Sequence, residues 1–77
     1  MAGDVIVWRA GILHARDSAT VSARDSATVY ARAATVYAYD SATVYVRGSA
    51  TVYAYDSATV YARGSATVYV YDSSVAV

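Results

Sequence analysis

The sequence predicts an all-β fold: a single β-solenoid with two strands in each 16-residue coil and a thin core of Ala and Val. Three observations predict it. Units of eight residues, such as ARDSATVY and ARGSATVY, repeat along the chain, and such repetition is typical of solenoids. Each unit joins a Thr-Val-Tyr stretch, which favours a strand, to an Asp-Ser or Gly-Ser pair, which favours a turn. Small aliphatic residues also alternate with larger or polar ones, as on the two faces of a strand.

Residues 1–14, MAGDVIVWRAGILH, precede the regular repeat and differ from it. We expect them to form an atypical N-terminal coil or a cap over the first coil, with the repeat spanning residues 15–77. Asp4 stands where a signal peptide is basic, and no apolar run approaches the roughly 20 residues of a membrane helix. We therefore expect no membrane contact, and a chain that is cytoplasmic or released by an unseen route.

The period is sixteen rather than eight, because two kinds of half-coil alternate along the second half of the chain. The unit from Ala31 to Tyr37 is one residue short, since Ala33 stands in place of an Asp-Ser pair. Helix is the competing interpretation because Ala is abundant, but the recurring Thr-Val-Tyr triplet favours strands. Residues 15–77, with the N-terminal segment, then predict about four to five coils. The pairs that begin the half-coils are Tyr39-Asp40, Arg47-Gly48, Tyr55-Asp56, Arg63-Gly64 and Tyr71-Asp72.

The alternation also predicts which side chains face the core. Val44 belongs to a position that is aliphatic in every unit, whereas the position of Tyr45 is held by His14 and Ser22 in early units. Burying the alternate set would bury Arg47 and its equivalents, at several kcal/mol each without partners. Ala and Val are therefore expected to point inward, and Thr, Tyr and Arg outward.

Equivalent residues of successive coils should stack about 4.8 Å apart in columns. One turn carries a column of Arg and the opposite turn a column of Asp. The outward faces carry columns of Thr and Tyr. The columns are Arg16, Arg32, Arg47, Arg63; Asp25, Asp40, Asp56, Asp72; Thr28, Thr43, Thr59; Tyr30, Tyr45, Tyr61; Thr35, Thr51, Thr67; Tyr37, Tyr53, Tyr69; and Tyr39, Tyr55, Tyr71.

Each column has a structural and a functional interpretation. The Asp carboxylates are expected to accept hydrogen bonds from backbone N–H groups of their own turns. Alternatively they pair with the Arg column of a neighbouring rod, or hold calcium. The Arg column is either a solvated edge or such a partner. The Tyr columns stabilise their sheets by stacking, and together they also form a surface suited to protein contacts.

The alternation of Tyr-Asp-Ser with Arg-Gly-Ser resembles the sixteen-residue repeats of bacterial ice-nucleation proteins. It is also similar to the Tyr-Asp-Ser-Ala-Thr-Val arrays of uncharacterised bacterial and phage proteins. The resemblance covers about residues 15–77 and implies a β-solenoid, with ice binding as an associated activity. Ice-nucleation repeats place Thr-x-Thr on the strand, whereas here Thr43 is followed by Val44 and Tyr45.

The chemistry of an enzyme is not evident in this sequence. His14 is the single histidine, the serines stand in turns without a nearby base, and Cys is absent. Six Arg balance six Asp, so the bulk charge favours neither nucleic acid nor an acidic membrane. We expect no catalytic site, no metal and no cofactor.

The ends of the chain carry the functional prediction. The last unit, YDSSVAV, runs out in mid-strand without Pro or Lys to protect the edge. We therefore expect a structural protein that partners itself, forming filaments by head-to-tail stacking of open coil edges. An ice-binding module and an adhesive piece of a larger surface or phage fibre are the alternatives. The residues expected to self-associate are Trp8, Val75, Val77, Tyr37, Tyr39, Tyr53, Tyr55, Tyr69, Tyr71, Arg16, Arg32, Arg47, Arg63, Asp25, Asp40, Asp56 and Asp72.

Overall fold

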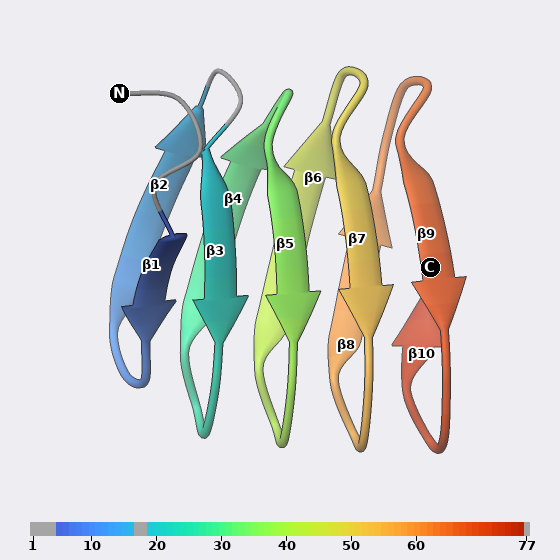
Figure 1. Ribbon diagram of the computed structural model, residues 1–77. Helices are drawn as coiled ribbons and strands as arrows, with labels where there is room; N and C mark the ends of the chain where they lie inside the picture. Colours follow the sequence, from blue (N-terminus) through green and yellow to red (C-terminus); the bar gives the residue numbers. More distant parts are fainter. Residues whose placement is uncertain (1–4, 17–18, 77) are drawn as a thin grey trace.

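The structure is a computed structural model that describes residues 5–16 and 19–76 (Figure 1). Within those ranges the chain forms ten short strands and no helix, so no helix is long and apolar enough to span a membrane. The strands are β1 Val5–Trp8, β2 Ile12–Arg16, β3 Thr20–Ala23, β4 Thr28–Arg32, β5 Thr35–Ala38, β6 Thr43–Arg47, β7 Thr51–Ala54, β8 Thr59–Ala62, β9 Thr67–Val70 and β10 Val75–Ala76.

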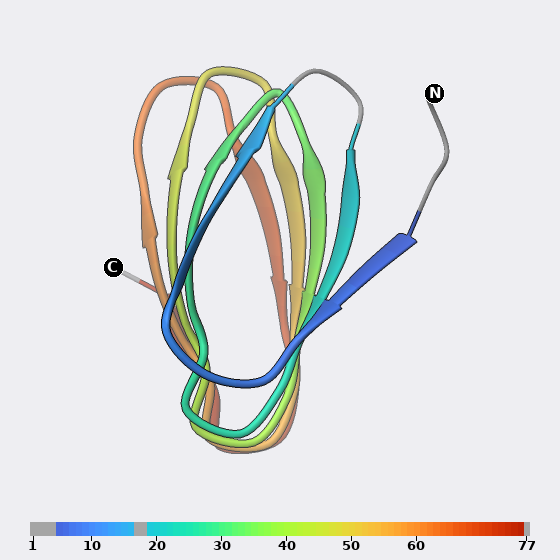
Figure 2. The same ribbon diagram turned by 90° about the vertical axis from the view of Figure 1, so that its left-hand side faces the viewer.

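The ten strands divide into two parallel sheets of five. The first sheet has the order β1-β3-β5-β7-β9 and the second β2-β4-β6-β8-β10, so each coil contributes one strand to each sheet (Figure 1). Seen from the N-terminal end, the chain turns clockwise as it recedes, so the coil is right-handed, as strand crossovers almost always are (Figure 2). The prediction of an all-β solenoid with two strands per coil of about 16 residues is confirmed.

The one-residue deletion is absorbed in a turn and does not disturb the strands. Thr20 pairs with Thr35, one residue closer in sequence than Thr35 is to its own partner Thr51, yet every position of β5 stays in register. Ala33 adopts a φ of 57°, the left-handed conformation that Gly48 adopts at the equivalent turn with a φ of 66°. Because the change in length falls outside the sheets, the inward and outward faces do not exchange.

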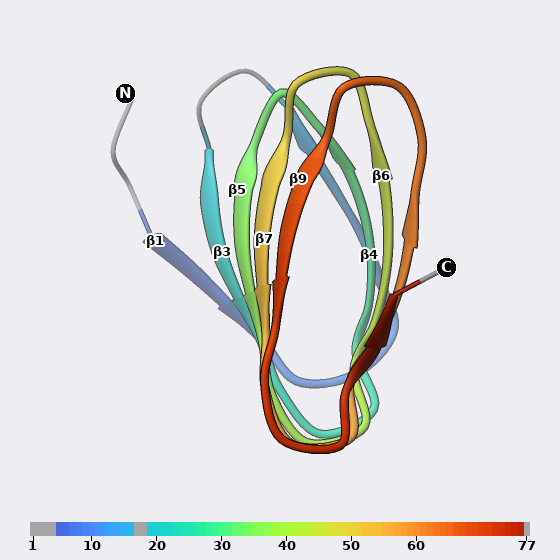
Figure 3. The same ribbon diagram turned by 90° about the vertical axis from the view of Figure 1, so that its right-hand side faces the viewer.

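The segment before the repeat keeps the same register. Val5 to Trp8 pair with Thr20 to Ala23, and Ile12 to Arg16 pair with Thr28 to Arg32. From Val5 onward, therefore, residues 1–14 contribute the strands of a first coil, whose turn at Arg9–Gly11 differs in sequence from the later ones. In Figures 2 and 3, β1 tilts away from the direction of the other first-sheet strands.

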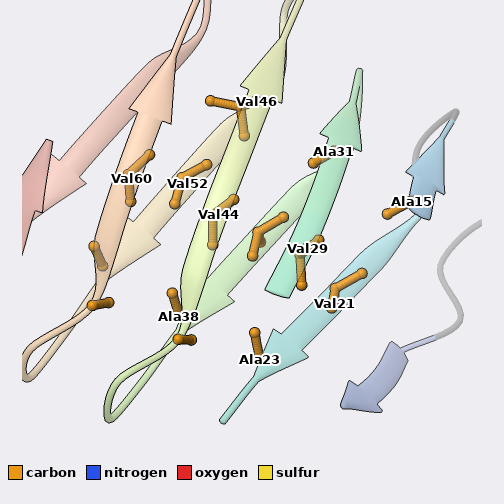
Figure 4. Close-up of a cluster of buried hydrophobic side chains, with 14 of the residues drawn as sticks. Ala15, Val21, Ala23, Val29, Ala31, Ala38, Val44, Val46, Val52 and Val60 are labelled. Carbon is orange, nitrogen blue, oxygen red and sulfur yellow. The ribbon is translucent and has the colours of Figure 1, made fainter. Parts of the chain in front are cut away.

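The core is the thin layer between the sheets and consists of Val and Ala (Figure 4). Successive Val residues stack along the axis, and each fully buried Val contributes roughly 1.5–3 kcal/mol. Side chains of β9 are less covered, because β9 is an end strand among the described residues: Val70 is 44% exposed. The predicted Ala/Val core is confirmed, and its largest fully buried side chains are Val21, Val29, Val36, Val44, Val46, Val52 and Val60.

Candidate functional site

Stacked aromatic rings run along both outward faces. On the second sheet His14 stacks on Tyr30, and the stack continues to Tyr45 and Tyr61 with ring centroids 4.8–5.1 Å apart. The first sheet carries two such stacks side by side, with interplanar angles of 9–11°. Their members are Tyr37, Tyr53, Tyr69 and Tyr39, Tyr55, Tyr71. Because the rings lie face to face along the axis, their edges and hydroxyl groups are what they offer to a partner.

The middle of the double stack is a poor place for a negative charge. Partial burial of Tyr55, followed by repulsion from the ionised forms of Tyr71, Tyr39, Tyr37 and Tyr53, raises the pKa of Tyr55 above its ordinary value of 10.0. The neutral phenol is therefore the form that the folded state favours.

This pKa shift predicts alkaline destabilisation. Below the unfolded pKa of 10.0, Tyr55 is neutral in both states and its ring packing is fully present. As the pH rises above that value, the unfolded chain releases a proton that the folded chain retains, so the free energy of unfolding falls. Urea titrations from neutral pH upward should show this fall, and it should be smaller in Tyr55→Phe, which keeps the ring. An identical pH profile for the two proteins would contradict the assignment to Tyr55.

The Asp edge is the row of turns that join first-sheet strands to second-sheet strands. These turns form the narrow lower rim in Figures 2 and 3. In each, Asp takes a φ between 55° and 58°, a conformation that Asp tolerates better than most residues. The residues of the Asp edge are Asp25, Asp40, Asp56 and Asp72.

The carboxylates of this edge bond to neighbouring turns. The backbone N–H of Asp40 donates to Oδ2 of Asp56 at 3.2 Å, and that of Asp56 donates to Oδ2 of Asp72 at the same distance. The positive φ points the Asp amide toward the following coil, whereas the Ser57 amide points back and donates to the Asp40 carbonyl. The prediction that each carboxylate serves its own turn is therefore wrong, because identical turns stacked this closely bring the next carboxylate within reach.

The Asp edge is also closed at its N-terminal end by a cation. Arg9 has a guanidinium nitrogen 4.0 Å from Oδ2 of Asp25, with both side chains largely exposed. Such an exposed pair adds little stability. The edge as a whole remains acidic and exposed along its length.

On the second sheet the Arg column and the adjacent aromatic stack form the two walls of a groove of about 570 Å³, which we name the Arg–Tyr groove. Its floor is lined by Ala15, Ala31 and Val46, whose buried side chains point away from the groove and into the core. None of the described residues that line it is acidic. The walls are His14, Tyr30, Tyr45, Tyr61 and Arg16, Arg32, Arg47, Arg63.

The two ends of the rod differ from its middle on the second sheet. The Thr column formed by Thr28, Thr43 and Thr59 continues to Ile12 at the N-terminal end and to Val75 at the C-terminal end. Ile12 is 59% exposed and Val75 is 53% exposed. A polar column thus finishes at both ends in an uncovered aliphatic side chain.

On the first sheet, a second column has Arg at its N-terminal end and Tyr at its C-terminal end. The Arg24 guanidinium lies 4.9 Å from the ring centroid of Tyr39. Arg9 occupies the preceding position, because Arg24 N–H donates to the Trp8 carbonyl as Tyr39 N–H does to that of Ala23. The column therefore begins with an Arg, and it ends at Tyr71, whose ring has no further ring of this chain beyond it.

The core layer is also uncovered at its ends. Trp8 and Leu13 are half-buried against the core at the N-terminal end, and Val70 is exposed at the C-terminal end, the end that faces the viewer in Figure 3. Within the described part of the chain, the buried Nε1 of Trp8 has no hydrogen-bond partner. Among the described residues, β9 and β10 are the end strands of their sheets on one side, and β1 and β2 on the other, so each has an outer edge with no strand beside it.

The structure places the sequence-predicted residues in five regions: the N-terminal end, the C-terminal end, the outward face of the first sheet with its two Tyr stacks, the Arg–Tyr groove and the Asp edge. Val77 lies outside the described residues. Sequence reasoning missed Ile12, Arg9 and Val70. They could have been found from the repeat, because each continues a column in which another residue type also occurs. Ice binding through the Thr columns and a role in a larger fibre stay predictions.

Comparison with known proteins adds no family to this description: no family model, curated protein or solved structure matches the chain. The described residues contain no group of three or more metal-ligating side chains placed to hold an ion. The fold and its stacked Tyr and Thr columns define the class of protein, a β-solenoid repeat protein.

Proposed function

We propose that this chain is a structural protein that assembles end to end, the C-terminal coil of one copy stacking on the N-terminal coil of the next. The free edges of β9 and β10 support this, because parallel strands with unpaired backbone groups are templates for further strands. A following copy would add β1 beside β9 and β2 beside β10, so that every strand in both sheets stays parallel to its neighbours.

The single observation that carries the proposal is that the exposed residues of the two ends match in pairs. Continuing the columns across the junction brings Val75 beside Ile12 of the next copy, and both are uncovered in one rod. It also brings Tyr71 beside Arg9, as Tyr39 lies beside Arg24 within the chain. Apolar contact and cation–π contact would then be gained together.

The same junction covers the open core. Val70 of one copy comes to lie against Trp8 of the next, because Trp8 and Ala23 are register partners and Val70 continues the column of Ala54. The contact is heterologous, since the two surfaces differ, and each added copy presents a new free end. Assembly therefore yields a filament rather than a closed dimer.

Adding charge to the C-terminal end tests this proposal. We expect the double variant Val70→Lys, Val75→Lys to fold and to raise the concentration needed for filaments by at least ~100-fold, because burying unpaired ammonium groups costs several kcal/mol. Negative-stain imaging and sedimentation measure the effect. The matched control is Ser49→Lys, Ser65→Lys, which adds the same charge at exposed turns and should assemble normally. Equal filament formation by both variants, or a parent protein that stays monomeric at high concentration, would overturn it.

A further inference from the structure

Charge is separated across the rod although the chain is neutral overall. The Arg–Tyr groove carries four guanidinium groups on the second sheet, and the Asp edge carries four carboxylates at the opposite turns. In both rows one residue is contributed by each coil, so the two rows have the same spacing, about 4.8 Å. A row of cations and a row of anions of equal pitch lie on opposite sides of one molecule.

The groove is suited to an anion along its whole length. Guanidinium groups pair with carboxylates through paired, charge-assisted hydrogen bonds. The opposite wall presents aromatic ring edges, which carry partial positive charge, because the ring faces are covered by their stacked neighbours. Both walls therefore favour negative charge, and no described carboxylate competes for the groove.

The spacing selects among anionic partners. An extended peptide places side chains of one face about 6.6–6.8 Å apart, so its carboxylates lose register with the Arg column within a few coils. Single-stranded nucleic acid gains much of its affinity by stacking bases on aromatic faces, and those faces are occupied here. The Asp edge of a second copy has the same spacing as the Arg column, because both rows contribute one residue per coil of the same fold.

The shapes also agree. The Asp edge is the convex, narrow rim of the coil in Figures 2 and 3, and its side chains are exposed. The Oδ2 atoms of Asp40, Asp56 and Asp72 each accept one backbone N–H, which fixes the carboxylates in a row and leaves Oδ1 for an outside donor. A rim with prearranged acceptors loses little side-chain freedom when it binds.

From charge, pitch and shape we infer that these rods bind side by side, the Asp edge of one copy entering the Arg–Tyr groove of another. This inference rests on the self-assembly proposed above and names a second contact surface for it, used between filaments rather than along them. Each copy offers one groove and one edge, so the contact is again heterologous and propagates sideways into sheets or bundles.

The test uses two variants in the background Val70→Lys, Val75→Lys, so that its outcome does not depend on end-to-end stacking. The groove variant is Arg32→Gln, Arg47→Gln. The edge variant is Asp40→Asn, Asp56→Asn, in which Asn tolerates the left-handed turn and still accepts the backbone N–H. A same-charge control, Arg9→Gln, Arg24→Gln, removes two guanidinium groups that lie outside the groove. Because Arg9 pairs with Asp25, their loss leaves the Asp edge no less acidic and should not weaken association.

We expect the background protein and the control to associate at low salt, and each test variant alone to associate at least ~10-fold more weakly. An equimolar mixture should restore association as one-to-one pairs, because the groove variant retains its edge and the edge variant retains its groove. Sedimentation at low and high salt reads out the four proteins and the mixture, and circular dichroism checks that each protein is folded.

Two results would overturn the inference. In the first, the mixture stays monomeric. In the second, a test variant associates as strongly as the background, for example when the groove variant loses association and the edge variant keeps it. That outcome would assign the groove to a part of the second copy other than Asp40 and Asp56. If proteins that keep Val70 and Val75 pair side by side but form no filaments, only the proposal of end-to-end stacking would be contradicted.

Discussion

Val44→Asp is expected to abolish the folded state. Val44 lies in β6, at the middle of the second sheet, and is 0% exposed. A carboxylate there would lie in a layer of Val and Ala with no polar partner, which costs several kcal/mol whether the group stays charged or takes up a proton. A small domain has about 5 kcal/mol of stability to lose, so one such substitution suffices.

The neighbouring residue on the same strand provides the control. Thr43 points outward, and Thr43→Asp should lower the free energy of unfolding by no more than ~1 kcal/mol, the range over which strand propensities differ. Circular dichroism and urea unfolding of the two variants measure the contrast. If both variants folded equally well, the assignment of inward and outward faces would be contradicted.

The faces of the strands could be predicted from the sequence because Arg recurs on one side of the alternation only. Arg47 and its equivalents forbid burial of the set that contains Tyr45, and this leaves Val44 for the core. The columns followed with equal certainty once the period was known, since stacking in a solenoid is fixed by residue number. The Tyr rings stack because residues one period apart lie in neighbouring coils.

The hydrogen bonds of the Asp edge could not be predicted in the same way. A turn read alone offers its own amides to Asp56. In the structure the backbone of Asp40, which also has a positive φ, directs its N–H along the axis to Oδ2 of Asp56. The direction of an N–H depends on backbone torsion, which residue types constrain only loosely. The Arg and Tyr columns that line the Arg–Tyr groove were predicted, but the groove between them was not, because its depth depends on the conformations of the side chains.

The C-terminal edge shows a third limit. The sequence singled out Val75 as part of an open C-terminal coil edge without assigning it a face, and the register places it outward, in line with Thr59. The core position at that end belongs to Val70, and the inward slot before Val75 is held by Ser74, whose hydroxyl donates to the Ala54 carbonyl. Val75 is still exposed and apolar, but in the proposed end-to-end assembly its partner would be Ile12 rather than a core residue.

This pairing predicts a covalent ladder. In an end-to-end filament Val75 of one copy and Ile12 of the next are neighbours in adjacent strands, about 4.8 Å apart, within the range of Cα separations that a disulfide spans. Within one chain the two residues lie at opposite ends of the Thr column, with Thr28, Thr43 and Thr59 between them, which is too far for a disulfide. The chain has no Cys of its own, so every disulfide would come from the introduced pair.

Oxidation of the double variant Ile12→Cys, Val75→Cys, read on a non-reducing gel beside each single variant, tests end-to-end assembly most directly. End-to-end stacking predicts a ladder of dimers, trimers and longer species from the double variant, and almost none from either single variant. A double variant that stays monomeric, or a single Val75→Cys variant that forms dimers as readily, would contradict it, the second result by showing that C-terminal ends pair with each other.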